Sequence, residues 1–132
     1  MPGARELMTQ LIQKRDKGQI KLAMLTALPD EWYADPQMKK QGRDDKKAWI
    51  VRHFPQITAD NVIVVRRRDK VKFAQKQQQI GHPAPVLIDD YPLNITEWHR
   101  DGRGVGILHT ATKGVWPTIR ELNQYLVAIQ GE

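Results

Sequence analysis

Val86-Leu87-Ile88-Asp89-Asp90 is the stretch that decides the predicted fold. A short apolar run that ends in two carboxylates is typical of a buried parallel strand carrying acid groups to the carboxyl edge of a sheet. Open α/β folds place their ligands at that edge. Because successive strand side chains point to opposite faces, we expect one of Asp89 and Asp90 to bind a metal ion and the other to cap or orient its neighbours.

Apolar patterns on both sides of this stretch alternate between strand and helix spacing. We expect strands at residues 20–25, 61–65, 86–88 and 105–108. The segment 30–43 is polar and broken by Pro36 and Gly42, so we expect no helix there. Helices are expected at 4–17 with a cap at Gly18, at 44–54, at 69–78, at 92–100, and from Pro117 with a Thr118-x-x-Glu121 capping box and Ile129 buried. The alternation predicts a single domain over residues 1–132, a three-layer α/β fold with a mainly parallel sheet.

Composition narrows the classes of function. The chain has 132 residues and no cysteine, which excludes disulfides, thiol catalysis and cysteine-zinc sites. The net charge of +6 favours phosphorylated or polyanionic partners, although lysines on solvated helix faces are the commoner cause of such an excess. No apolar stretch reaches the roughly 18–20 residues that span a bilayer, and no signal-peptide core is visible, so we expect a cytoplasmic protein without a membrane partner.

Polar side chains follow several of the expected strands. Thr26 is expected at the exit of the first strand, Lys70 or Lys72 after the second, and Asp89 with Asp90 after the third. In a parallel sheet these exits share one edge, where residues distant in sequence can meet one ligand. A hydroxyl donates to a phosphate oxygen, a lysine offsets its charge, and a carboxylate holds Mg²⁺. The pattern therefore predicts a metal and phosphate site.

The order of these motifs resembles the haloacid dehalogenase superfamily, and within it the 5′(3′)-deoxyribonucleotidase-like branch. By this resemblance, Thr26 hydrogen-bonds the transferred phosphoryl group, Lys70 steadies it with Lys72 as competitor, and Asp89 and Asp90 help to hold Mg²⁺. The resemblance implies a Rossmann-like three-layer fold. The stretches that carry it are Pro2-Gly3-Ala4, Leu25-Thr26-Ala27-Leu28-Pro29, Asp69-Lys70-Val71-Lys72-Phe73-Ala74, Val86-Leu87-Ile88-Asp89-Asp90 with Asn94 and Trp98, and Gly104-Val105-Gly106-Ile107-Leu108-His109.

One departure from the family outweighs these matches. Its members begin with a strand that carries an aspartate nucleophile and, two residues later, an aspartate acid/base, followed by a cap domain. This sequence has no D-x-D element. The resemblance places the missing strand in the middle of the sheet, between residues 20–25 and 86–88. Unpaired backbone groups there would each cost about 1–3 kcal/mol, so the two flanking strands should pair directly, or a strand from elsewhere should fill the opening.

The sequence therefore leads to the hypothesis that this chain is the C-terminal part of a Mg²⁺-dependent phosphatase. It would hydrolyse nucleoside monophosphates once a separately encoded N-terminal half supplies the nucleophilic aspartate, and it would be inactive alone. The alternative is a catalytically silent binding protein on the same scaffold, in one form a homodimer that exchanges strands.

Other chemically suggestive residues receive structural interpretations. Nucleic-acid binding is the weakest hypothesis, because aromatic residues interleaved at base-stacking spacing are absent near the basic cluster and no helix-turn-helix or zinc motif is visible. That cluster consists of Arg66-Arg67-Arg68, Lys70, Lys72 and Lys76. Trp32 is expected in the core or, together with Tyr33, lining a substrate cleft. The four histidines lack metal-ligand spacing and are expected to be structural or solvent-exposed: His53, His82, His99 and His109.

Overall fold

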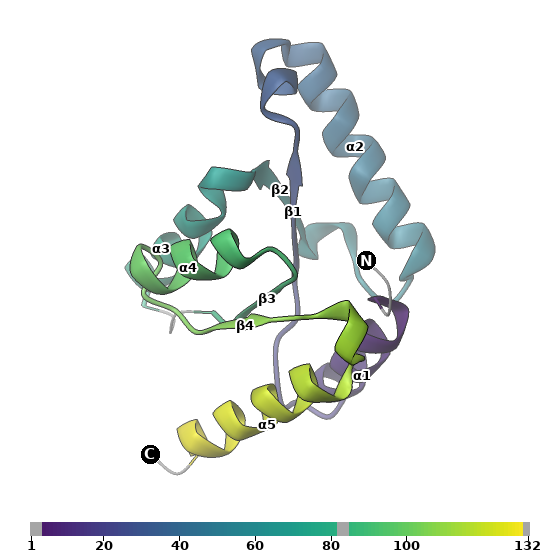
Figure 1. The fold of residues 1–132 in the computed structure, drawn as a ribbon. Coiled ribbons are helices and arrows are strands. Elements are labelled where there is room, and N and C mark those ends of the chain that lie inside the picture. The colour runs from purple at the N-terminus through teal and green to yellow at the C-terminus, as the bar shows by residue number, and fades with distance from the viewer. Residues whose placement is uncertain (1–3, 82–84, 131–132) are drawn as a thin grey trace. The chain divides into compact units, whose positions relative to one another are not determined.

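The computed structural model describes residues 4–81 and 85–130. Its backbone divides into two compact units, Leu11–Lys70 and Met1–Gln10 with Val71–Glu132, which we call the 11–70 unit and the 71–132 unit. The elements, drawn in Figure 1, are α1 (Ala4–Asp16), β1 (Met24–Leu28), the 3-10 helix η1 (Asp30–Ala34), α2 (Pro36–His53), η2 (Ala59–Asn61), β2 (Val62–Arg66), η3 (Arg67–Asp69), α3 (Lys70–Gln79), β3 (Leu87–Asp89), α4 (Pro92–Arg100), β4 (Gly106–Leu108), η4 (Ala111–Lys113) and α5 (Trp116–Gln130).

In the 11–70 unit, β1 and β2 pair in parallel, from Met24 opposite Val62 to Leu28 opposite Arg66. Helix α2 connects the two strands and packs against both, as Figure 1 shows. Apolar side chains between these elements are almost fully buried, among them Leu28, Ile50, Ile57, Val62 and Val64. This strand-helix-strand arrangement follows from apolar runs too short and too β-branched for helices, separated by a longer amphipathic segment.

Helix α2 begins at Pro36, inside the segment for which we expected no helix, so that expectation is wrong. Asp35 caps the helix by accepting hydrogen bonds from the backbone N–H groups of Gln37 (2.9 Å) and Met38 (3.4 Å). Proline at the first helical position costs no hydrogen bond. Gly42 lies inside the helix because the Trp32 ring packs on it, and a Cβ there would come within 2.6 Å of Trp32 Cε3.

The end of α1 agrees with the sequence. Gly18 has φ +74°, a left-handed conformation that favours glycine. The N–H of Gly18 donates to the carbonyl of Arg15 at 2.9 Å, and the N–H of Gln19 donates to the carbonyl of Lys14 at 3.0 Å. This pair of bonds is the Schellman motif, so the predicted helix cap at Gly18 is confirmed.

In the 71–132 unit, β3 and β4 pair in parallel, with Leu87 opposite Gly106 and Asp89 opposite Leu108. Helix α4 packs against both strands. Its Trp98 is 1% exposed and donates its ring N–H to the carbonyl of Pro85 at 2.9 Å. The backbone of Gly104 lies against the Trp98 ring, and a Cβ at this position would lie 2.5 Å from Trp98 Nε1, so a residue without a side chain is needed there. The aromatic side chain thus fixes the loop before β4.

Helix α5 begins one residue earlier than predicted, at Trp116, and its predicted capping box is wrong. Thr118 lies in the first turn rather than at the cap, and its buried hydroxyl contacts His109 instead of the helix backbone. Ile119 and Leu122 are buried as expected, whereas the side chain of Ile129 lies outside the described residues.

The predicted mixture of helices and parallel strands is confirmed. Within the described residues the four strands form two separate two-stranded sheets, β1 with β2 and β3 with β4. Among these residues, no helix combines the length and the apolar character needed to cross a bilayer.

Candidate functional site

Asp89 is the last residue of β3 and organises the turn into α4. One carboxylate oxygen accepts the backbone N–H of Tyr91 at 2.9 Å, and the other accepts the side-chain amide of Asn94 at 3.0 Å. Its backbone carbonyl accepts the N–H of His109 at 2.8 Å. Asn94 is itself buried. Since both carboxylate oxygens already hold protein donors, Asp89 orients the start of α4.

Asp90 follows the strand and is exposed to solvent. The sequence predicted different roles for the two adjacent acids, and the hydrogen bonds give the orienting role to Asp89. Asp90 is thus the carboxylate of the pair that faces water. The described residues contain no group of three or more acidic, histidine or cysteine side chains that could hold a metal ion. One or two carboxylates nevertheless suffice for Mg²⁺, which keeps waters and binds substrate oxygens.

Thr26 lies in the middle of β1, opposite Val64, and not at the strand exit where we expected it. The strand occupies residues 24–28, later than the predicted 20–25, because the apolar run continues through Ala27 and Leu28. Side chains alternate along a strand, so Thr26 shares a face with Leu28, whose side chain approaches Gly42 of α2. The half-buried Thr26 hydroxyl therefore lies on the face of the sheet that α2 covers.

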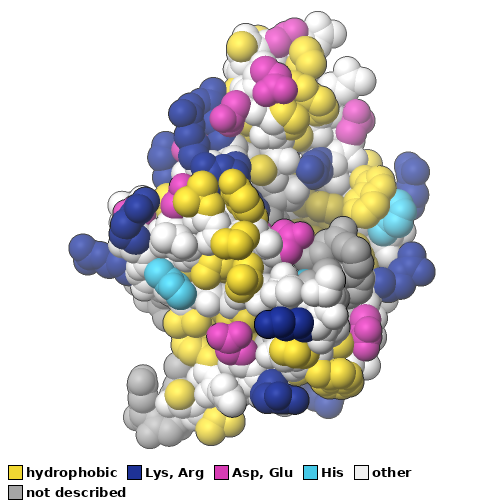
Figure 2. All heavy atoms as spheres, viewed as in Figure 1, with side chains coloured by type: hydrophobic (Ala, Val, Ile, Leu, Met, Phe, Trp, Pro, Cys, Tyr) yellow, Lys and Arg dark blue, Asp and Glu magenta, His cyan; other side chains and the backbone are white. Residues whose placement is uncertain are grey.

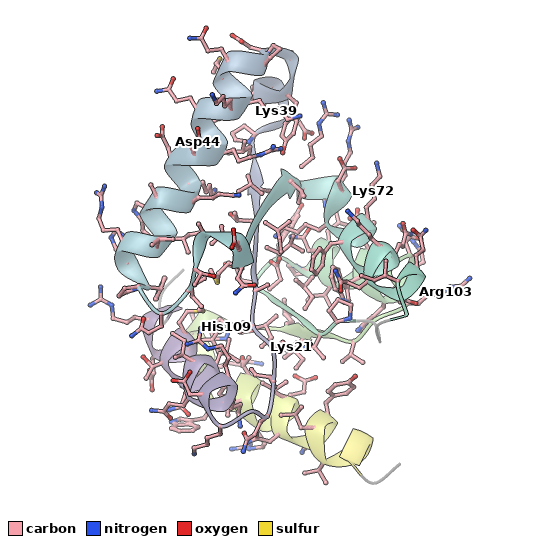
Figure 3. The ribbon with its side chains drawn as sticks, turned by 180° about the vertical axis from the view of Figure 1, so that it is seen from behind. Lys21, Lys39, Asp44, Lys72, Arg103 and His109 are labelled. Atoms are coloured by element: carbon pink, nitrogen blue, oxygen red, sulfur yellow. The ribbon has the colours of Figure 1, made fainter. Side chains whose placement is uncertain are left out.

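The two candidate lysines lie in the first turn of α3. Lys70 is its first residue and half-buried, whereas Lys72 is exposed; Figure 3 labels Lys72 on this helix. Thr26 and Lys70 belong to the 11–70 unit, and Lys72, Asp89 and Asp90 belong to the 71–132 unit. Within each unit, the candidate residues come from a strand or from the helix that follows one.

His109 is a buried polar residue whose contact the sequence did not reveal. It directly follows β4, is 1% exposed, and its Nδ1 lies 2.7 Å from the hydroxyl of Thr118. Its Nε2 is buried without a hydrogen-bond partner among the described residues. Figure 3 labels His109 at the end of β4. Because Asp89 and His109 are bonded through their backbones, this imidazole belongs to the same sheet edge as the acid pair.

Two other histidines have the structural roles that we predicted. His53 Nδ1 lies 2.8 Å from the carbonyl of Trp49, and the two rings stack. His99 accepts the backbone N–H of Gly106 at 2.8 Å and so holds the start of β4. His82 lies outside the described residues.

A groove of about 580 Å³ runs along α5. Its walls are mainly apolar, and Trp116 and Val127 are more than half exposed. The groove offers no carboxylate and therefore does not belong with the candidate metal site. Its lining comes from Trp116, Ile119, Arg120, Asn123, Gln124 and Val127.

The clearest effect of one charge on another lies outside the candidate site. Arg100 donates hydrogen bonds to both carboxylate oxygens of Asp101, at 3.0 and 2.8 Å. These bonds lower the pKa of Asp101 below its ordinary value and raise the pKa of Arg100. Both side chains are exposed, so this pair has little influence on stability.

Comparison with models of protein families, with curated proteins and with solved structures gives no match to this chain.

Proposed function

We propose that this chain is the C-terminal part of a Mg²⁺-dependent phosphatase of the haloacid dehalogenase type, which acts on nucleoside monophosphates once another segment supplies its nucleophilic aspartate. One observation carries the proposal: in the described residues, β1 pairs only with β2 and β3 pairs only with β4. Within that part of the chain, β1 and β3 therefore each have a second edge without a neighbouring strand. A cytoplasmic setting is part of the proposal.

An open strand edge presents backbone N–H and C=O groups that another strand can pair with. Two strands seldom make a stable sheet, and parallel sheets are normally larger and covered on both faces. A strand inserted between β1 and β3 would convert the two pairs into one five-stranded, Rossmann-like sheet with helices on both faces. The family resemblance places the missing first strand at that position, and such a strand would carry the D-x-D element that this sequence lacks.

The candidate residues near the strand ends then have roles in phosphoryl transfer. Lys70, or its competitor Lys72, would offset the charge that develops on the phosphoryl oxygens. The expected role of Thr26 as a donor to phosphate is not part of the proposal, because Thr26 lies in the middle of β1 on the face that α2 covers. Asp90 would hold the cation, while Asp89 keeps the turn in place through Asn94. Bound Mg²⁺ would offset negative charge on the phosphoryl group and so ease attack by the added carboxylate.

The direct test mixes the 132-residue chain with a synthetic peptide of about ten residues that carries an apolar strand and a D-x-D element. Phosphate release from a deoxynucleoside monophosphate is measured with and without Mg²⁺. We expect release only with chain, peptide and Mg²⁺ together. A peptide with the first aspartate changed to asparagine is the matched control, and it should be inactive although it pairs with the chain equally well.

Two outcomes would contradict the proposal. Phosphate release by the chain alone would show that it needs no added nucleophile. Equal release by the two peptides would show that the added carboxylate does not attack phosphorus. Asp90→Asn should raise the Mg²⁺ concentration needed for half-maximal rate, and an unchanged requirement would remove Asp90 from the metal site.

The same open edges favour a second candidate, a binding protein without catalysis that closes its sheets by exchanging strands with a second copy. Light scattering at several concentrations separates the two. A concentration-dependent dimer that the D-x-D peptide does not dissociate supports exchange, whereas a monomer at every concentration contradicts it.

A further inference from the structure

We propose that Tyr33, Lys39, Arg43 and Arg66 form a binding site for the phosphate group of a phosphate monoester. All four residues belong to the 11–70 unit. The site differs from the sequence-predicted residues Thr26 and Lys70, and it needs no strand from outside the chain.

Two cations converge on the ring of Tyr33. The guanidinium carbon of Arg66 lies 4.6 Å from the ring centroid, and the Lys39 ammonium lies 5.2 Å from it. Arg66 is the last residue of β2, and Lys39 lies in the first part of α2, where Figure 3 labels it beside η1. No local sequence pattern indicates this arrangement, because Tyr33 and Arg66 are 33 positions apart along the chain.

Arg43 adds a third positive charge to the same side of α2. It is one helical turn beyond Lys39 and adjacent to Gly42, the residue on which Trp32 of η1 packs. Residues four apart lie on the same face of a helix, so Arg43 faces the turn that carries Tyr33. Figure 2 shows lysine and arginine side chains gathered over the end of β2 and the turn that follows it.

None of these three cations forms an ion pair with a carboxylate in the part of the chain that the structure describes. The charges of Lys39 and Arg66 lie over one ring, no farther apart than the Debye length of ~10 Å at 0.1 M salt, so they repel each other. Asp35, four residues before Lys39, is one of the acids near the cluster in sequence, and its carboxylate caps α2. A bound anion would remove this repulsion.

Two buried donors of the cluster also have no partner. The hydroxyl of Tyr33 and Nε of Arg43 are buried and make no hydrogen bond within the described residues. Buried polar groups are normally hydrogen-bonded, and an orphaned one suggests a ligand or water. Here both orphaned groups can donate, so the missing partner should be an acceptor.

The position of the cluster agrees with this conclusion. Arg66 ends β2, and η1 with Tyr33 follows the end of β1, so the cluster lies at the carboxyl ends of two parallel strands. Parallel α/β units bind ligands at this edge. A guanidinium, an ammonium and a phenol together recognise an oxyanion, and the doubly charged terminal phosphate of a monoester suits three cations better than a singly charged phosphodiester does.

Isothermal titration calorimetry on the 132-residue chain tests the site directly. The probes are inorganic phosphate, a nucleoside monophosphate, and a dinucleotide that has a phosphodiester but no terminal phosphate. We expect saturable one-to-one binding of the first two and much weaker binding of the third. Arg66→Gln should reduce phosphate affinity roughly tenfold or more, because it removes a charge-assisted hydrogen-bond donor. Arg68→Gln is the matched control, since it removes the same charge from an exposed neighbour and should change affinity less than about threefold.

Several results would overturn the proposal. These are no phosphate binding by the unmodified chain, equal losses in the two arginine variants, and dinucleotide binding as tight as monophosphate binding, which would indicate a nucleic-acid backbone instead. Circular dichroism checks the fold of each variant. If Arg66→Gln does not fold, the variants Tyr33→Phe and Arg43→Gln test the site instead. Unchanged phosphate affinity in both variants contradicts the proposal. Because no added strand is present, this outcome is independent of the proposed phosphatase activity.

Discussion

Gly42 offers the sharpest test of how the 11–70 unit is packed. In the middle of an ordinary helix, glycine is about 1 kcal/mol less favourable than alanine, so Gly42→Ala should stabilise α2 if only helix propensity matters. In this structure, however, the added Cβ would lie 2.6 and 2.7 Å from Trp32 Cε3 and Cζ3 and 3.3 Å from Leu28 Cδ2. We therefore expect the substitution to destabilise the protein.

The magnitude follows from these distances. Carbon atoms in contact prefer about 3.5–4.0 Å, so the indole must move by roughly 1 Å, and such overpacking typically costs about 1–3 kcal/mol. Against a propensity gain of about 1 kcal/mol, the net effect is a loss of up to about 2 kcal/mol. Replacing Trp32 by leucine removes the flat ring from the contact. In the Trp32→Leu background, Gly42→Ala should therefore increase the free energy of unfolding, whereas it should decrease that free energy when Trp32 is present.

Urea unfolding followed by circular dichroism measures all four members of this double-mutant cycle. Because Trp32 and Tyr33 are neighbours in η1, Gly42→Ala should also weaken phosphate binding at the proposed site. If Gly42→Ala raised the free energy of unfolding by about 1 kcal/mol with Trp32 intact, this result would refute the packing that we describe.

Three further outcomes follow from particular contacts. Asp89→Ala should lower the free energy of unfolding by about 1–3 kcal/mol, because it leaves the donors at the start of α4 without their acceptor, whereas Asp90→Ala should change it by less than about 0.5 kcal/mol; equal effects in urea unfolding would contradict the assigned roles. Thr118→Val should cost about 1–3 kcal/mol, since it removes the partner of His109 Nδ1 from a buried site; no change in the unfolding midpoint would count against this contact. Arg100→Gln should raise the pKa of Asp101, because the hydrogen bonds from Arg100 that lower this pKa are lost. NMR titration measures the change. With the arginine present, this lowered pKa favours the folded state above the pKa of the unfolded chain, and the benefit disappears as the pH falls through the folded value.

The helix and strand pattern was largely predictable because it depends on local periodicity. The strand ending in Asp89, the helix beginning at Pro92 and the cap at Gly18 all lie within one residue of their predicted places. The first half of α2 was missed because proline and glycine usually interrupt helices. Here Pro36 occupies the first helical position, and Trp32 fills the space that a side chain at residue 42 would take.

The candidate site was only partly predictable. The acid pair can be found from its position after an apolar run, and the sequence indicated that the two acids should differ in role. Which acid orients the turn depends on Asn94 and the Tyr91 N–H, and no pattern states those contacts. The prediction that Thr26 lies at the end of its strand was wrong, because the strand lies a few residues later than expected. A continuous apolar run does not mark where pairing with the next strand begins.

The sequence by itself determined that helices alternate with parallel strands, that two acids follow a buried strand, and that no D-x-D element is present, since each of these is local in the chain. Only the tertiary structure decided that, in the described part of the chain, β1 pairs with β2 alone and β3 with β4 alone, that His109 is buried against Thr118, and that Arg66 at the end of β2 lies over the ring of Tyr33 in η1. These features depend on residues distant in sequence, whose contacts are set by packing and backbone pairing rather than by periodicity.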